Sequence, residues 1–154
     1  MIRTFRLTCV PIVLAILACG LPSRAAAAGP APLIFDTDMG NDVDDALALG
    51  MIHGFQRRGG CRLIAVTLSK DNRYAAPFVD IVNTFYGYSD VPIGVVRGGM
   101  TPDDGNYLRK MVCAEDNGQP RYPHKLRDGS QAPEATAVLR RALAAEADGS
   151  VVVV

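Results

Sequence analysis

The stretch LIFDTDMGNDVDDALAL, residues 33–49, joins an apolar run to a helical pattern through a loop that holds five aspartates within ten positions. An apolar run, a polar loop and a helical pattern in this order are typical of the first strand and helix of an α/β domain. Five carboxylates this close repel one another, and their pKa values rise unless a cation compensates the charge. The stretch therefore predicts a fold class and a candidate site together.

Beyond that stretch, short apolar runs alternate with longer helical patterns. We expect strands at 33–35, 63–68 and 93–96, and helices at 44–58, 77–86 and 133–147. The first helix is indicated by residues that recur at three- and four-residue spacing, namely Leu47, Met51, Ile52 and Phe55. Pro77 near one helix start and Gly87 beyond its end follow the usual asymmetry. Residues 98–132 are polar and rich in Gly and Pro, and we expect a long loop there.

Continuous apolar strands separated by helices indicate parallel pairing with helices on both faces. The predicted class is α/β, doubly wound, with a mostly parallel, open, Rossmann-like sheet. The four valines at 151–154 predict a fourth strand, of the buried central kind. Because no turn or covering helix follows them, we interpret residues 29–154 as the amino-terminal part of a larger domain, truncated after this strand.

Residues 1–28 form a secretory signal pattern. Arg3 and Arg6 precede the apolar stretch 7–21, and a run of alanines follows at 25–28. The stretch is short for a membrane span, so we expect cleavage and a periplasmic or secreted product with no membrane attachment. Cleavage leaves two cysteines, Cys61 and Cys113, and either a disulfide or two free thiols agrees with the sequence.

The overall charge argues against a nucleic-acid partner. Lys plus Arg and Asp plus Glu each number 16, the formal net charge is zero, and no basic stripe is visible. A small-molecule or metal site is therefore the better expectation.

The aspartate loop favours a hard cation over a purely structural role. Helix capping and the helix dipole account for one or two acids near Asp44 and Asp45, not for five. The loop offers oxygen ligands and contains neither Cys nor His, so calcium is favoured over zinc. An EF-hand is excluded, because Asn41 stands where that loop needs glycine and Leu47 where it needs glutamate.

The string DTDMGNDVDDALAL, residues 36–49, resembles the Asp-x-Asp-x-Gly-x-Asp-Asp-Ala loop of the inosine-uridine preferring nucleoside hydrolase family. Two extra residues separate the glycine from Asp-Asp-Ala, as in a bacterial branch of that family. The resemblance extends from Leu33 to Val154 through SKDNRYAAPFVDIVNTFYG (69–87), VPIGV (91–95) and APEATAVLRRALAA (132–145). It implies an exported enzyme that hydrolyses the N-glycosidic bond of ribonucleosides or related N-ribosides with calcium.

Within the loop, the resemblance implies that Asp38 and Asp45 bind Ca²⁺ and that Asp38 is also the general base toward water. Asp44 is implied to hold the ribose hydroxyls. Asp36 matches the first acid of the family loop, where it is implied to orient the loop and to be the third residue of the metal site. Asp42 lies where this chain has two extra residues relative to the family loop, so the resemblance implies no role for it.

Outside the loop, the resemblance implies two further residues. Asn72 matches an asparagine that contacts the substrate near the reacting sugar, although a turn asparagine explains it equally well. His124 corresponds to a loop histidine that reaches the site, but the glycines around that histidine are missing here. Tyr107, Tyr122 and Arg109 are either contacts for a base or ordinary surface-loop residues.

The family completes its calcium shell, and its acid for the leaving base, from residues that lie beyond position 154. The resemblance therefore implies that this chain holds roughly half of the site, binds calcium weakly and has little or no activity alone. The substrate partner is a small nucleoside or riboside, and a homo-oligomer of the full-length form is left open.

Two other functions are left open by the residues. A strand followed by Asp36-Thr37-Asp38 is similar to the haloacid dehalogenase phosphohydrolases, with Asp36 as nucleophile and Thr67 or Ser69 as the phosphate-binding hydroxyl. That family expects Thr or Val where Gly40 stands. A non-catalytic exported protein that binds calcium or a sugar is the other alternative.

Overall fold

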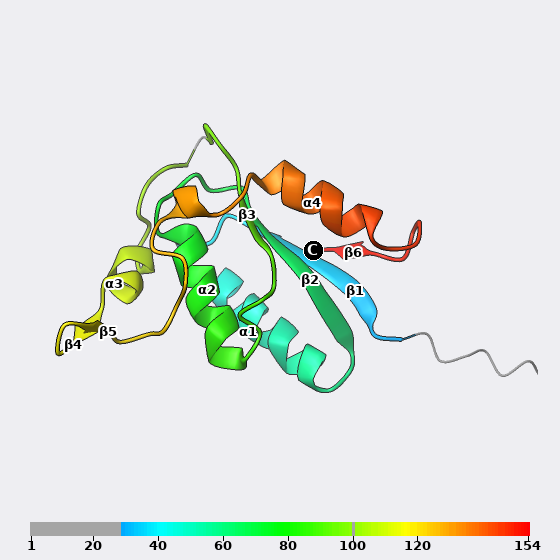
Figure 1. Ribbon diagram of the computed structural model, residues 1–154, viewed down its shortest axis with the longest axis horizontal. Coiled ribbons are helices and arrows are strands. Elements are labelled where there is room, and N and C mark those ends of the chain that lie inside the picture. The colour runs from blue at the N-terminus through cyan, green and yellow to red at the C-terminus, as the bar shows by residue number, and fades with distance from the viewer. Residues whose placement is uncertain (1–28, 100) are drawn as a thin grey trace, which may run out of the picture.

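The computed structural model describes residues 29–99 and 101–154. The predicted signal peptide, residues 1–28, lies outside the described residues. Figure 1 shows the chain as a sheet with helices on both faces. The elements follow in this order: β1 (Ala31–Thr37), α1 (Asp44–Arg57), β2 (Cys61–Leu68), α2 (Ala75–Tyr86), β3 (Ile93–Val95), α3 (Leu108–Val112), β4 (Glu115–Asp116), β5 (Gln119–Pro120), the 3₁₀ turn η1 (Gly129–Gln131), α4 (Ala135–Ala144) and β6 (Val152–Val153).

The main sheet is parallel, with strand order β3-β2-β1-β6. Helices α1 and α2 cover one face and α4 covers the other (Figure 1). This arrangement confirms the predicted α/β class with a mostly parallel, Rossmann-like sheet. In the register of β1 and β2, Asp36 lies opposite Thr67 and Thr37 opposite Leu68, so the two strands end side by side.

The hydrophobic core is divided by the sheet into two unequal parts. The larger cluster lies on the side of α1 and α2 and includes Phe35, Leu49 and Val66. The smaller cluster lies under α4 and consists of Ile34, Ala65 and Val138, with partly buried residues around it. Ile34 and Phe35 belong to different clusters because successive strand residues point to opposite faces.

The helix ends agree with the local sequence signals. Helix α2 begins at Ala75, two residues before Pro77, and ends at Tyr86, where its C-cap is Gly87, whose φ of +85° is readily adopted by glycine. Helix α4 begins two residues later than the predicted 133–147 because Glu134 is its N-cap and accepts a hydrogen bond from the Ala137 amide at 3.0 Å, and it ends earlier, at Ala144.

The face of α1 that meets the core differs from the periodic set in the sequence. Leu49, Ile52 and His53 are buried, whereas Leu47 and Met51 are more than 60% exposed. Apolar residues stand on both sides of this helix, so their spacing indicates a helix without deciding which side faces the sheet.

One further expectation is wrong. Residues 98–132 are not a plain loop, since they contain α3, the β4–β5 hairpin and η1. The terminal valines do form the predicted fourth strand, β6, which pairs in parallel with β1 and is partly exposed in the described part of the chain. Nowhere in residues 29–99 and 101–154 is a helix both long and apolar enough to cross a membrane.

The two described cysteines are free thiols. Cys61 is buried at the start of β2, where its thiol donates a hydrogen bond to the Ile52 carbonyl at 3.6 Å, and Cys113 is exposed after α3. Of the two alternatives that the sequence left open, the structure therefore has the unpaired one.

Candidate functional site

The aspartate loop lies at the topological switch point of the sheet. From β1 the chain adds β2 and β3 on one side and later returns to place β6 on the other side of β1. Ligands of open α/β sheets bind beyond the carboxyl ends of the strands at such a switch point. Residues 36–45 leave the carboxyl end of β1, so the fold puts them where a ligand site is expected.

Asp36 is held by the neighbouring strand. The Thr67 hydroxyl donates a hydrogen bond to Asp36 Oδ1 at 2.5 Å, and the Asp36 amide donates to the Val154 carbonyl at 2.7 Å. Thr67 is thus engaged with a carboxylate. Ser69, the other candidate hydroxyl of a phosphohydrolase, donates to the Thr37 carbonyl at 3.3 Å.

The turn after Asp38 depends on a glycine, as the sequence predicted. The Met39 amide donates to the Thr37 hydroxyl oxygen at 3.0 Å, and the Met39 side chain is buried. Gly40 has a φ of +143°, and a Cβ atom there would lie 2.7 Å from Leu108 Cδ1. Both the backbone conformation and the lack of space therefore require glycine at this turn.

Asp38, Asp44 and Asp45 gather at the start of α1. Burial raises the pKa of the Asp45 carboxyl, and the negative charges of Asp38 and Asp44 raise it further, while a hydrogen bond with Thr37 opposes the change. The N-cap residue, Val43, makes no side-chain capping bond, and the Asp45 amide donates to Asp44 Oδ1 at 3.0 Å. The acids are therefore crowded beyond what helix capping requires, and a cation would relieve their repulsion.

Tyr107 reaches the same cluster from the segment before α3. Its hydroxyl is buried without a hydrogen-bond partner, and its ring packs edge-on against Phe78 with centroids 5.1 Å apart. Burial, followed by the charges of Asp45, Asp42 and Asp44, raises the pKa of Tyr107 to about 12. From the sequence, Tyr107 was only one of several candidate residues in a long loop. It is far from the aspartates along the chain, so its proximity to them in space could not be predicted.

Asn72 is buried, and both polar atoms of its side chain are hydrogen-bonded within the protein. Its side-chain nitrogen donates to the carbonyls of Pro102 and Asp103, each at 2.9 Å, and to Asp104 Oδ1 at 3.1 Å, while its oxygen accepts from the Tyr74 amide at 2.7 Å. To contact a substrate, Asn72 would have to exchange these bonds for new ones.

Lys70 is a residue that sequence reasoning missed. Its side chain is fully buried, and its ammonium contacts Asp103 Oδ1 at 3.0 Å and Asn41 Oδ1 at 3.5 Å. A lysine two residues after a buried strand was the only signal in the sequence, and most lysines are solvent-exposed.

His124 is joined to other parts of the molecule. Its Nδ1 lies 2.6 Å from the Tyr122 carbonyl, and the following residue, Lys125, donates its amide to Asp80 in the middle of α2. Among the described hydrogen bonds, none connects His124 with the aspartate loop.

The donors present fit one part of a calcium site. Asp38 and Asp45 are neighbouring carboxylates of the hard-oxygen kind that Ca²⁺ prefers. However, no three His, Cys, Asp or Glu side chains within residues 29–99 and 101–154 form a group that could enclose a metal ion. Asp36 is directed to Thr67, so the described chain offers a pair of ligands rather than a closed shell.

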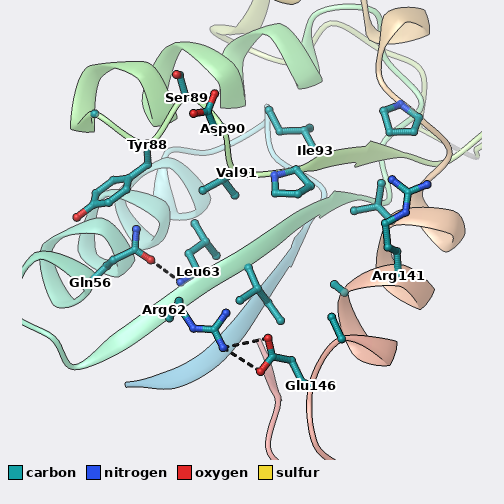
Figure 2. A pocket seen from close by; sticks show the side chains of 17 residues that line it. Gln56, Arg62, Leu63, Tyr88, Ser89, Asp90, Val91, Ile93, Arg141 and Glu146 are labelled. Atoms are coloured by element: carbon teal, nitrogen blue, oxygen red, sulfur yellow. Dashed lines mark hydrogen bonds and ion pairs between the residues drawn. The ribbon is translucent and has the colours of Figure 1, made fainter. Parts of the chain in front are cut away.

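The large hollows of the molecule lie elsewhere. One of about 760 Å³ lies between the start of β2, the residues before β3 and the carboxyl half of α4 (Figure 2). Figure 2 shows Arg62 and Glu146 paired at its rim, at 2.8 Å. Another of about 780 Å³ lies over the outer surfaces of α1 and α2 and is mostly apolar. No aspartate of residues 36–45 lines either hollow, so we place the candidate site on the aspartate loop by chemistry rather than by size.

No protein-family model matches the chain, and no curated protein matches it.

Proposed function

We propose that this chain carries the metal-binding and general-base part of a calcium-dependent N-glycoside hydrolase that acts on ribonucleosides or related N-ribosides. The proposal includes export to the periplasm or the medium. It combines the resemblance of residues 36–49 to the nucleoside hydrolase loop with the position of that loop in the structure.

One observation carries the proposal: Asp38 and Asp45 are crowded together at the switch point of a parallel sheet. Burial, and then the neighbouring charges of Asp38 and Asp44, raise the pKa of Asp45, and the buried Tyr107 hydroxyl nearby donates to no protein acceptor. Such an arrangement is unfavourable without a cation and favourable with one. A purely structural loop would gain nothing from it.

The residues have distinct proposed roles. Asp38 and Asp45 would hold Ca²⁺, which supplies Lewis acidity toward water and sugar hydroxyls. Asp38 takes a proton from the attacking water, whose oxygen bonds to the sugar C1′ as the bond to the base nitrogen breaks. The base nitrogen leaves with the electron pair of that bond and takes up a proton from water. The carboxylates stabilise the positive charge that develops on the sugar, and Asp44 accepts hydrogen bonds from ribose hydroxyls. Asp36 orients the start of the loop through Thr67.

Terbium luminescence tests the cation site on the chain itself. Tb³⁺ is a hard, oxygen-seeking ion that tyrosine sensitises at short range, and the chain contains five tyrosines and no tryptophan. Tyr107 lies beside the acids, so we expect sensitised emission that Ca²⁺ displaces. Asp38→Asn and Asp45→Asn should each weaken binding at least tenfold. Tyr107→Phe should remove most of the emission while Ca²⁺ binding, measured by calorimetry, remains.

The matched control is Asp116→Asn, which removes an exposed acid paired with Arg121 in the β4–β5 hairpin. This variant should bind terbium as the wild type does. If Asp38→Asn and Asp116→Asn weaken binding equally, the ion is held by general surface charge, and the proposed site is wrong.

Turnover requires its own measurement, because binding alone fits a non-catalytic calcium or sugar protein. The intact mass of the protein from its natural source identifies the form to assay. In that form, calcium-dependent release of ribose that Asp38→Asn abolishes would support the hydrolase. Ligand-dependent stabilisation without turnover, or trapping of an aspartyl-phosphate mimic on Asp36, would replace it with one of the two alternatives.

A further inference from the structure

Lys70 follows β2 by two residues and is the largest fully buried side chain in the described part of the chain. Its ammonium lies 3.0 Å from Asp103 Oδ1 and 3.5 Å from Asn41 Oδ1. Burying an ammonium is costly unless hydrogen bonds and an opposite charge compensate it. The chemistry proposed above does not use this group, so its burial beside the aspartate loop needs another explanation.

Residues Pro102–Asn106, which we call the strap, cross from the end of β2 to the aspartate loop. Asn72 holds the first half of the strap through the three hydrogen bonds described above. At the other end, the Asn106 amide donates to the Gly40 carbonyl at 2.7 Å, and the Asn106 side chain donates to the Asn41 carbonyl. The strap therefore fastens the turn that separates Asp38 from Asp45.

The contact between strap and turn is too close for side chains. A Cβ atom on Gly105, where φ is +58°, would lie 2.0 Å from the Gly40 carbonyl oxygen. A Cβ atom on Gly40 would lie 3.3 Å from Lys70 Cε as well as against Leu108. The backbone of Gly40 is thus enclosed by the strap, the stem of Lys70 and α3.

We propose that Lys70 is a positioning residue for the cation site. By bonding Asn41 in the turn and Asp103 in the strap, its ammonium fixes the Gly40–Asn41 turn and so sets the approach of Asp38 and Asp45. This inference rests on the proposed function for the identity of the cation, but the placement of the turn can be measured without any cation.

The direction in which one substitution changes the cation affinity distinguishes a positioning role of Lys70 from a simple charge effect. Lys70→Met removes a positive charge near an acidic cluster, which by Coulomb's law alone tightens cation binding. If Lys70 positions the turn, Lys70→Met weakens Tb³⁺ binding at least tenfold. Affinity equal to or tighter than that of the wild type overturns the proposal, provided that circular dichroism shows the variant to be folded.

Amide hydrogen exchange supplies the cation-free measurement. In Lys70→Met we expect the Asn106 amide to exchange at least tenfold faster, while amides of α4 such as Ala137 keep their wild-type rates. Unchanged exchange at Asn106 overturns the proposal. If the wild type shows no Asp38-dependent terbium binding, the proposed function fails, and the exchange rates alone decide whether Lys70 fixes the turn.

A second pair of variants avoids the core. The Asp103 side chain is 60% exposed, so Asp103→Ala should fold even if Lys70→Met does not. Asp104→Ala removes the same charge one residue away without touching Lys70, and Asn72 keeps two of its three acceptors. We expect Asp103→Ala to weaken terbium binding and to speed Asn106 exchange at least fivefold more than Asp104→Ala. Equal effects of the two variants overturn the proposal.

Discussion

The two faces of the sheet are built differently. On the side of α1 and α2, a cluster of eighteen buried hydrophobic residues extends from Phe35 to Ala132, and it includes Met39 and Leu108 beside the aspartate loop. On the side of α4, three buried residues form the whole cluster. Buried apolar area is the main source of stability, so the first face should supply most of it. The candidate site is anchored to that first face.

The largest expected loss of stability comes from replacing a buried leucine, and it should differ between the two faces of the sheet. Leu49 of α1 is fully buried, whereas Leu139 of α4 is only partly buried. Leu49→Ala should lower the free energy of unfolding by about 2–5 kcal/mol, since a cavity remains in a well-packed cluster. Leu139→Ala should cost clearly less. Urea denaturation measures both, and equal losses would show that the faces are energetically alike.

The next effect concerns the attachment of the site to the larger face. Gly105→Ala places a Cβ atom against the Gly40 carbonyl and should separate the strap from the turn. Gly118→Ala is the matched control, because Gly118 also has a positive φ, +77°, but open space around its Cβ position. In both variants, the positive φ should destabilise the folded state by about 1 kcal/mol. Only Gly105→Ala should also weaken terbium binding.

A smaller, pH-dependent effect on stability is expected from His53, which lies on the face of the sheet with the larger cluster. His53 is buried between the rings of Tyr86 and Tyr88, with Nε2 2.8 Å from Asn83 Oδ1. Burial lowers the pKa of His53 below its usual 6.5, although the bond with Asn83 opposes the change.

The sign of the pH effect follows from proton binding. Between pH 6.5 and the lower pKa of folded His53, the unfolded chain binds a proton that the folded chain does not. Stability should therefore be constant above about pH 7 and should fall toward pH 5 by at most about 1.4 kcal/mol per pH unit. Thermal denaturation of His53→Gln should lack this fall, whereas His124→Gln, which changes the only other histidine, should retain it.

The smallest effect is expected at the ion pair that joins the thinner face to β2. Arg62 and Glu146 are 2.8 Å apart at the rim of the hollow in Figure 2, but the Arg62 side chain is 51% exposed. An exposed pair of this kind contributes about 0–1 kcal/mol. Glu146→Gln should therefore shift the denaturation midpoint only slightly, and 1 M salt should remove the difference from the wild type. A loss comparable to that of Leu49→Ala would contradict the unequal division of the core.

Local signals in the sequence were sufficient for much of the fold. The alternation of apolar runs and helical patterns predicted the parallel α/β class, and Gly87 and Gly40 were placed by the turns that need them. The aspartates could be recognised as a dense cluster of acids because they are adjacent in the chain. All of these features depend on residues within a few positions of one another.

Contacts between distant segments were not predictable in the same way. The strap meets the aspartate loop across more than sixty residues, and Lys70 reaches Asp103 across thirty-three. Nothing in the Gly- and Pro-rich stretch 98–132 distinguishes such a segment from a surface loop. The buried face of α1 was missed for a similar reason, since the partners of His53 lie on and after α2.

The parallel α/β sheet and the cluster of acids after the first strand can be read from the amino acids alone, because strand alternation, helix spacing and local charge density are properties of neighbouring residues. The proximity of Asp45 to Asp38, the position of Tyr107 against the acids and the contact of a buried lysine with the turn between them appear only in the folded chain. Burial and charge pairing depend on which distant segments the sheet brings together.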